Sequence, residues 1–169
     1  MKHWLWLSLL ILVLDQASKW LIQAALNPFD PLTLTANLNL TLMFNDGAAF
    51  SFLATVGGWQ RWLFTVLAAA VSVGLTLWLL RLRRDERLLA AALALLIGGA
   101  IGNLIDRILL GHVVDFIQVS LPVIPLALFN PWPAFNLADS AITLGVVLLL
   151  LATLFESPAP RGHLDQDSA

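Results

Sequence analysis

The chain has 169 residues, of which 59% are hydrophobic and only 12% are charged, and its mean hydropathy is +0.84. Soluble domains carry about 25% charged residues, so this composition excludes an ordinary soluble domain, and the high hydrophobicity excludes a disordered chain. The formal net charge of −2 provides no basic excess for binding nucleic acid, and the lack of cysteine excludes disulfides, thiolate catalysis and cysteine-bound metals.

Four apolar stretches are long enough to cross a bilayer as helices, which takes about 20 residues each. They run at about 4–26, 59–80, 88–110 and 138–155. The first stretch also looks like a signal peptide, but Asp15 and Lys19 interrupt its apolar run, so we interpret it as a retained helix. We therefore predict an all-α membrane protein whose single domain covers residues 1–155.

The basic residues predict the orientation of these helices, because lysine and arginine gather in cytoplasmic loops. The loops 27–58 and 111–137 contain neither residue. All basic residues outside the helices lie on the other side: Lys2, Arg81, Arg83, Arg84, Arg87 and Arg161. We predict cytoplasmic termini, two outer loops and a disordered cytoplasmic tail at 156–169. We interpret the arginines of 81–87 as a topology signal rather than as a lipid- or protein-binding patch.

The outer loops contain patterns of regular structure. Residues 33–44 alternate between polar and apolar side chains, which predicts a half-buried β-strand, and residues 45–47 predict a turn after it. Residues 48–52 are expected to return as a second strand, and 113–119 is rich in strand-forming residues. We predict a small extracytoplasmic β-sheet, followed by an irregular, proline-rich interfacial loop at 118–135.

Polar residues in the helices converge at one depth, near the predicted outer surface. They come from three helices and the strand after the third: Asp15, Lys19, Asn103, Asp106, Arg107, Asp115, Asn136 and Asp139. Each of these residues also has a purely structural interpretation; Asp15 and Lys19, for example, could simply form an ion pair within the helix. Beside them, Gly98 and Gly102 form a G-x-x-x-G motif, which is typical of close helix packing. Ionisable groups in a membrane are costly and are usually functional, so the shared depth favours a site.

The available residue types narrow the chemistry. There is no H-E-x-x-H zinc motif and no G-x-S-x-G, and only His112 lies near the outer surface. A Ser–Lys dyad would have to combine Lys19 with Ser51. Two aspartates that share a proton can activate water for peptide hydrolysis. Asp115 and Asp139 are the natural pair, because both lie where water is available.

Two other classes of function compete with hydrolysis. A small transporter or proton channel would use the intramembrane Asp, Lys and Arg set, and a noncatalytic scaffold would use the glycine packing motif. The charges are confined to the outer part of the bundle, and helix 88–110 is apolar up to Ile101. A transporter should instead have polar groups or broken helices near the midplane.

Five motifs in order resemble those of the lipoprotein signal peptidase (signal peptidase II) family. They are D-Q-A-S-K at 15–19, N-D-G-A-A-F-S at 45–51, G-G-A-I-G-N-L-I-D-R at 98–107, V-V-D-F-I at 113–117 and F-N-L-A-D-S at 135–140. The resemblance implies an aspartic endopeptidase of the bacterial inner membrane. Such enzymes remove signal peptides from diacylglyceryl-modified prolipoproteins, cleaving before the lipidated cysteine.

The resemblance also implies roles for individual residues. Asp115 and Asp139 would be the catalytic dyad, and the supporting residues would be Asp15, Lys19, Asn45, Asn103, Asp106, Arg107 and Asn136. We expect no metal or cofactor, a monomer in contact with membrane lipid, and inhibition by the cyclic peptide globomycin. The segment between Asp115 and Asn136 is longer and more apolar than the family pattern suggests, yet it has to bring the two aspartates together.

Overall fold

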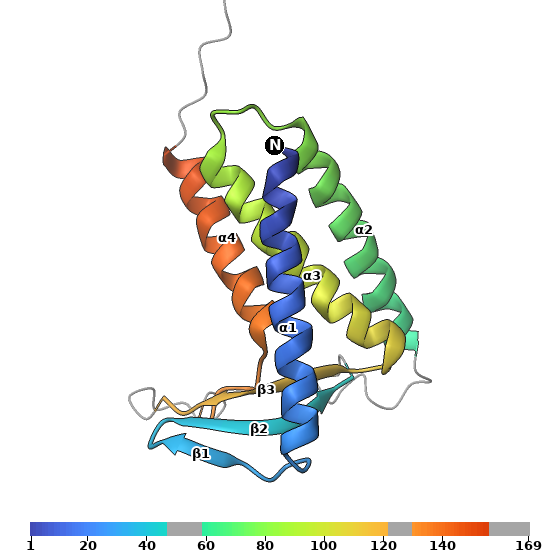
Figure 1. The fold of residues 1–169 in the computed structure, drawn as a ribbon, viewed down its shortest axis with the longest axis vertical. Coiled ribbons are helices and arrows are strands. Elements are labelled where there is room, and N and C mark those ends of the chain that lie inside the picture. Colours follow the sequence, from blue (N-terminus) through green and yellow to red (C-terminus); the bar gives the residue numbers. More distant parts are fainter. Residues whose placement is uncertain (47–58, 122–129, 156–169) are drawn as a thin grey trace, which may run out of the picture.

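The computed structural model of the chain describes residues 1–46, 59–121 and 130–155, and shows a helical bundle standing on a small sheet (Figure 1). A 3₁₀ turn, η1 (Lys2–Trp4), precedes the first long helix. The long helices are α1 (Leu5–Ala25), α2 (Trp59–Arg81), α3 (Arg87–Leu109) and α4 (Leu137–Phe155). Each is long and apolar enough to cross a membrane, which confirms the four predicted spans to within one residue at each end.

Helix α3 is the centre of the bundle. Within its most apolar window 67% of the residues are buried, against 17–22% in the other three helices, whose large apolar side chains face outward. Glycines allow this close packing. A Cβ atom on Gly98 would lie 2.7 Å from the Ser8 carbonyl oxygen of α1, and one on Gly99 would lie 2.4 Å from the Ala138 carbonyl oxygen of α4. The backbones of α1 and α4 therefore approach α3 as the packing motif predicts.

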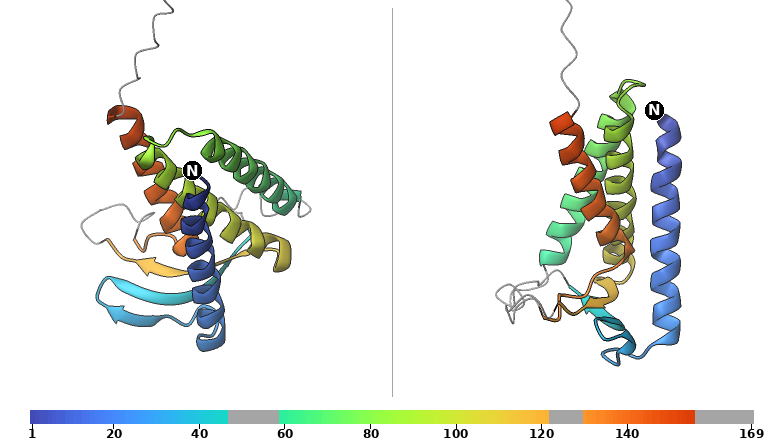
Figure 2. Two further views of the ribbon diagram at one scale, coloured as in Figure 1. Left: turned by 45° about the horizontal axis from the view of Figure 1, so that its top comes forward. Right: turned by 90° about the vertical axis from the view of Figure 1, so that its left-hand side faces the viewer.

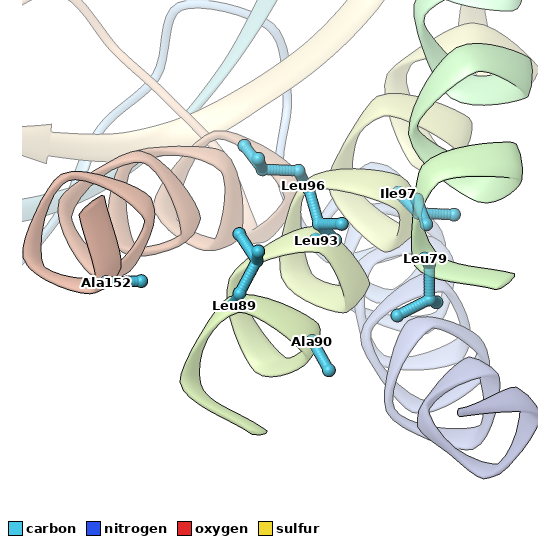
Figure 3. Packing of buried hydrophobic residues seen from close by; sticks show 7 residues of the cluster. All are labelled: Leu79, Leu89, Ala90, Leu93, Leu96, Ile97 and Ala152. Atoms are coloured by element: carbon cyan, nitrogen blue, oxygen red, sulfur yellow. The ribbon is translucent and has the colours of Figure 1, made fainter. Parts of the chain in front are cut away.

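The apolar core lies at the end of the bundle away from the sheet, where α3 meets α2 and α4 (Figure 3). Its buried members are Leu79, Leu89, Ala90, Leu93, Leu96, Ile97 and Ala152.

The sheet has three antiparallel strands in the order β1 (Leu32–Thr35), β2 (Leu38–Asn45) and β3 (Val113–Val119). The third strand confirms the prediction for 113–119. The single strand predicted at 33–44 is wrong, because Thr35 pairs with Leu38 across a two-residue turn and forms a hairpin. The alternation of polar and apolar residues runs unbroken through the turn residues 36 and 37, so the pattern does not reveal the turn. A register shift between Thr33 and Thr35 then pairs polar Thr33 with polar Asn39, which keeps like residues on the same face.

Several sequence predictions fall on residues that the structure does not describe. These are the second strand at 48–52, the central part of the interfacial loop and the tail at 156–169. In the described residues, the N-terminus and the α2–α3 connection lie at one end of the bundle, and the sheet lies at the other (Figure 2).

Candidate active site

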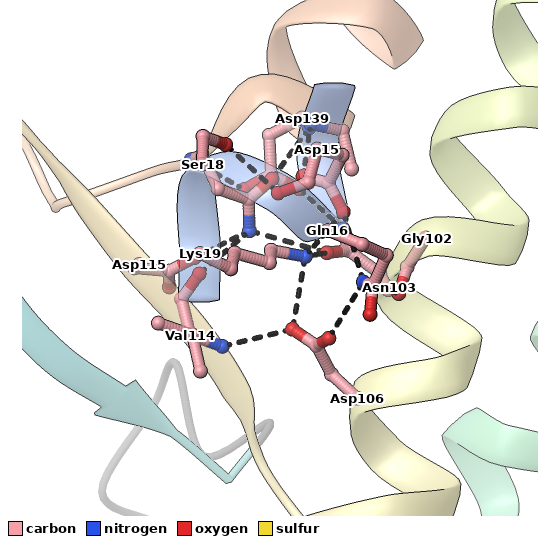
Figure 4. Close-up of polar contacts among 12 residues, drawn as sticks. Asp15, Gln16, Ser18, Lys19, Gly102, Asn103, Asp106, Val114, Asp115 and Asp139 are labelled. Atoms are coloured by element: carbon pink, nitrogen blue, oxygen red, sulfur yellow. Dashed lines mark hydrogen bonds and ion pairs between the residues drawn. The ribbon is translucent and has the colours of Figure 1, made fainter. Parts of the chain in front are cut away.

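A buried ion cluster joins α1 to α3 at the sheet end of the bundle (Figure 4). The Lys19 ammonium group lies 2.8 Å from the Asp15 carboxylate and 2.9 Å from the Asp106 carboxylate, and it donates a hydrogen bond of 2.9 Å to Asn103 Oδ1. Lys19, Asp15 and Asp106 are at most 3% exposed. Lysine has three N–H donors, and all of them have an acceptor here. Lys19 is therefore occupied structurally and is not free to act as a base.

The two carboxylates of this cluster also hold neighbouring backbone in place. Asp15 Oδ1 accepts a hydrogen bond of 2.9 Å from the Ala138 N–H, at the start of α4, and Asp106 Oδ2 accepts one of 3.1 Å from the Val114 N–H of β3. The Gln16 amide donates to both carboxylates, at 3.2 Å to Asp15 and 2.9 Å to Asp106. A cluster formed by α1 and α3 thus fixes the two segments that carry Asp115 and Asp139.

Asn136 links the two aspartates of the predicted dyad. Its Nδ2 donates 2.7 Å to Asp115 Oδ1, while its backbone N–H donates 3.2 Å to Asp139 Oδ2. The Asp139 N–H in turn donates 2.9 Å to Asn136 Oδ1, so the two residues cap the start of α4 reciprocally. The helix cap and the contact to the strand aspartate are therefore made by one asparagine side chain.

Two further asparagines complete the surroundings of the dyad. Asn103 Nδ2 donates 2.7 Å to Asp139 Oδ1, and Asn103 Oδ1 accepts bonds from Lys19 and Asn136. Asn45, the last residue of β2, donates 3.0 Å to Asp115 Oδ2. Each carboxylate oxygen of the pair thus accepts at least one hydrogen bond. Through Asn103 and Asn136, these hydrogen bonds connect both aspartates to Lys19 of the ion cluster.

Backbone pairing brings the segment before α4 back to β3. The Phe135 carbonyl oxygen accepts hydrogen bonds from the Phe116 and Ile117 N–H groups at 3.0 and 2.8 Å, and the Phe135 N–H donates 3.0 Å to the Ile117 carbonyl oxygen. Phe135 comes directly before the Asn136 cap. The chain therefore comes back to β3 just before α4 begins, and this pairing brings Asp139 close to Asp115.

Asp115 is 2% exposed and sits outside the membrane helices. The pKa of its carboxyl is raised to about 6, chiefly because burial disfavours the charged form. The hydrogen bonds from Asn45 and Asn136 oppose this rise, and the negative charge of Asp139 adds to it. Arg107 interacts electrostatically with both aspartates, donates 3.3 Å to the Asn103 carbonyl oxygen and lies over the Phe64 ring. The arrangement is a pair of interacting carboxyls, shielded from solvent and lying beside one guanidinium.

A family model for signal peptidase (SPase) II matches residues 7–155, which is most of the chain. The chain belongs to the signal peptidase II family. It is 56% identical to the lipoprotein signal peptidase of Pseudomonas fluorescens over 88% of this chain and 85% of that protein. It is 53% identical to the lipoprotein signal peptidase of Acinetobacter baumannii over 94% of this chain and 87% of that protein.

A solved structure of a bacterial membrane enzyme, determined by the in meso method at 1.9 Å resolution, has a similar fold. Its TM-score is 0.79 at 28% sequence identity, with 93% of this chain and 96% of that chain covered. These findings confirm the signal peptidase II family and the function it implies, the removal of signal peptides from prolipoproteins by a bacterial membrane protease. The alternative of a small transporter or proton channel receives no support from them.

The structure brings together all of the site residues predicted for this signal peptidase II family member: Asp15, Lys19, Asn45, Asn103, Asp106, Arg107, Asp115, Asn136 and Asp139. Ser51, the alternative partner of Lys19, lies outside the described residues. The His112 ring packs against the Phe44 ring at a tilt of 53°, with ring centroids 4.5 Å apart.

Two contributing residues were missed by the sequence reasoning. Gln16 bridges the buried carboxylates, and its position next to Asp15 in a membrane helix was the available signal. Arg61 of α2 donates 2.9 Å to the carbonyl oxygens of Arg107 and Ile108, so it caps the end of α3 from which Arg107 projects. Nothing in the spacing of Arg61 indicated this contact, because it joins residues 46 and 47 positions apart.

Proposed function

We propose that the chain is an aspartic endopeptidase in which Asp115 and Asp139 activate a water molecule to cleave the signal peptide of a prolipoprotein. The observation that carries this proposal is the bridge through Asn136, which hydrogen-bonds to both carboxyls. Two interacting carboxyls cannot both ionise readily, so the pair titrates as a unit and keeps its last proton to a higher pH than a free aspartate does.

The chemistry requires one carboxylate and one carboxylic acid. The carboxylate removes a proton from water as the water oxygen attacks the scissile carbonyl carbon, and the acid donates its proton to the carbonyl oxygen. We assign the proton-bearing role to Asp115, because it is the more deeply buried of the two aspartates and burial raises its pKa to about 6. Asp139 then acts as the base. When the tetrahedral intermediate collapses, Asp139 donates the proton it took from water to the leaving nitrogen, Asp115 takes one back from a hydroxyl group of the intermediate, and the peptide bond breaks.

The supporting residues position the dyad rather than react. The Lys19 cluster fixes the Ala138 and Val114 backbones that flank Asp139 and Asp115. Asn45 and Asn103 each hold one carboxylate oxygen, so both carboxyls are oriented before substrate arrives. Such pre-organisation lowers the barrier because the groups need not reorient during reaction.

The proposed setting is the bacterial inner membrane, with both termini cytoplasmic and the sheet end at the outer face. The basic residues of the described loops lie at the other end of the bundle, which supports this orientation. The diacylglyceryl chains of the substrate would remain in lipid and hold the scissile bond at headgroup depth. We further propose a monomer whose peptidase domain covers residues 1–155, and inhibition by globomycin-type peptides at the dyad.

The test is cleavage of a diacylglyceryl-modified precursor by the wild type and by the Asp115→Asn and Asp139→Asn variants in detergent. Asp30→Asn is the matched control, because Asp30 is an exposed aspartate in the outer region and loses the same charge. We expect cleavage by the wild type and the control, and a loss of about 10³-fold in both dyad variants. Near-normal activity in either dyad variant would show that the pair is misassigned.

A further inference from the structure

A basic cavity lies at the end of the bundle opposite the sheet. There the start of the chain runs beside the loop between α2 and α3, as Figures 1 and 2 show. The cavity has a volume of about 430 Å³ and is lined by Met1, His3, Trp4, Arg84 and Arg87. It is separate from the dyad, and the proposed peptidase reaction uses none of these residues.

Two of its lining residues, Arg84 and Arg87, are cations that form no ion pair within the part of the chain that the structure describes. The guanidinium of the neighbouring Arg83 lies 3.0 Å from the Asp85 carboxylate, and the Arg83 backbone N–H donates to the Glu86 carboxylate. Both acidic residues of this loop therefore interact with Arg83. Among residues 1–46, 59–121 and 130–155, neither Arg84 nor Arg87 forms an ion pair. Two guanidinium groups at one cavity favour an anion with several oxygen acceptors, since guanidinium forks match phosphate oxygens.

The remaining wall of the cavity is suited to lipid. Met1 and Trp4 line it and also pack against the apolar core. The Trp4 Nε1–H is buried and has no acceptor in the described part of the chain. Tryptophan and basic residues at the end of a membrane helix lie at the level of the headgroups. Arg87 is the first residue of α3, so the cavity is at that depth.

We propose that this cavity binds the headgroup of an anionic phospholipid from the leaflet opposite the active site. Arg84 and Arg87 hold the phosphate, and the Met1–Trp4 wall contacts the glycerol and the first part of the acyl chains. The volume is in the range of pockets that enclose a small ligand. The arginines of 81–87 thus divide into two that line the proposed lipid site, Arg84 and Arg87, and two that lie outside it, Arg81 and Arg83.

The experiment titrates the purified full-length protein in neutral detergent with dioleoylphosphatidylglycerol and follows the thermal unfolding midpoint. Dioleoylphosphatidylcholine and inorganic phosphate are titrated in parallel. The test variant combines Arg84→Gln with Arg87→Gln. The matched control combines Arg81→Gln with Arg83→Gln, which removes the same charge from the same region but leaves the cavity lining intact.

We expect phosphatidylglycerol to raise the wild-type midpoint at lower concentration than phosphatidylcholine. Its apparent affinity should fall about tenfold in the cavity variant and less than about twofold in the control, because charge-assisted hydrogen bonds are lost only in the former. The single Arg84→Gln variant, which perturbs the loop less, should lose about threefold by the same reasoning.

Three results would overturn the proposal. Equal losses in the cavity variant and the control would show diffuse attraction of the lipid to surface charge. A midpoint shift with inorganic phosphate equal to that with phosphatidylglycerol would identify a free-phosphate site. Equal affinity of the wild type for the two lipids would show that the cavity does not select an anionic headgroup.

Discussion

Replacing Asp115 with asparagine should abolish cleavage and also make the protein more stable at neutral pH. Burial raises the pKa of this carboxyl from 3.8 to about 6. A pKa that is higher in the folded than in the unfolded state means that folding favours the protonated carboxyl. The stabilisation that the protonated Asp115 carboxyl gives to the folded state is therefore fully present below about pH 3.8. It is lost as the pH rises through about 6, where the buried carboxyl ionises.

The magnitude follows from the size of the shift. Each pKa unit corresponds to about 1.4 kcal/mol, so at pH 7.5 the buried, ionised Asp115 costs on the order of 3 kcal/mol. Asparagine does not ionise and avoids this cost. Its NH2 group replaces one carboxylate oxygen, however, and would face the N–H donor of Asn45 or Asn136, so about 1 kcal/mol of hydrogen bonding is lost. The expected net gain in the free energy of unfolding is about 2 kcal/mol at pH 7.5.

The measurement is chemical unfolding in detergent micelles, followed by tryptophan fluorescence at pH 4 and pH 7.5. The gain of Asp115→Asn over the wild type should be present at pH 7.5 and largely absent at pH 4, where the wild-type carboxyl is protonated. The exposed control Asp30→Asn should change stability by no more than about 0.5 kcal/mol. A gain of the same size at both pH values, or a loss at pH 7.5, would refute ionisation of a buried carboxyl as the cause.

Three other substitutions probe the scaffold of the site. Lys19→Met leaves two buried carboxylates unpaired and should destabilise the protein by about 3–5 kcal/mol in chemical unfolding, with partial recovery when Asp15→Asn is added. Gly102→Ala places a Cβ 2.6 Å from Asp15 Oδ2, so it should cost about 1–3 kcal/mol and lower the cleavage rate; unchanged kinetics would mean that Asp15 can shift freely. Asn136→Ala removes the α4 cap and the bridge between the aspartates, and should lower kcat far more than KM in precursor cleavage; a pure KM effect would contradict a positioning role.

Local sequence features were sufficient for the helices and for picking out the polar residues that the structure brings together. The ends of α1 to α4 follow from hydropathy, because a bilayer requires about 20 apolar residues in a continuous helix. The polar residues stood out because a membrane-spanning segment tolerates them only where they have partners or a function. The hairpin between β1 and β2 could not be recognised, because the alternating pattern continues through its turn and a register shift in β1 keeps like residues on one face.

The sequence by itself therefore determined the class of protein, the helix boundaries and the identity of the polar residues, since each depends on neighbouring residues alone. Only the tertiary structure decided which polar residues meet. The Asp15 carboxylate reaches the Ala138 N–H across 123 positions, and Phe135 pairs with β3 to set Asn136 between the two aspartates. These contacts join distant segments, so their partners, the burial of Asp115 and its raised pKa are properties of the packed bundle and have no local signal in the chain.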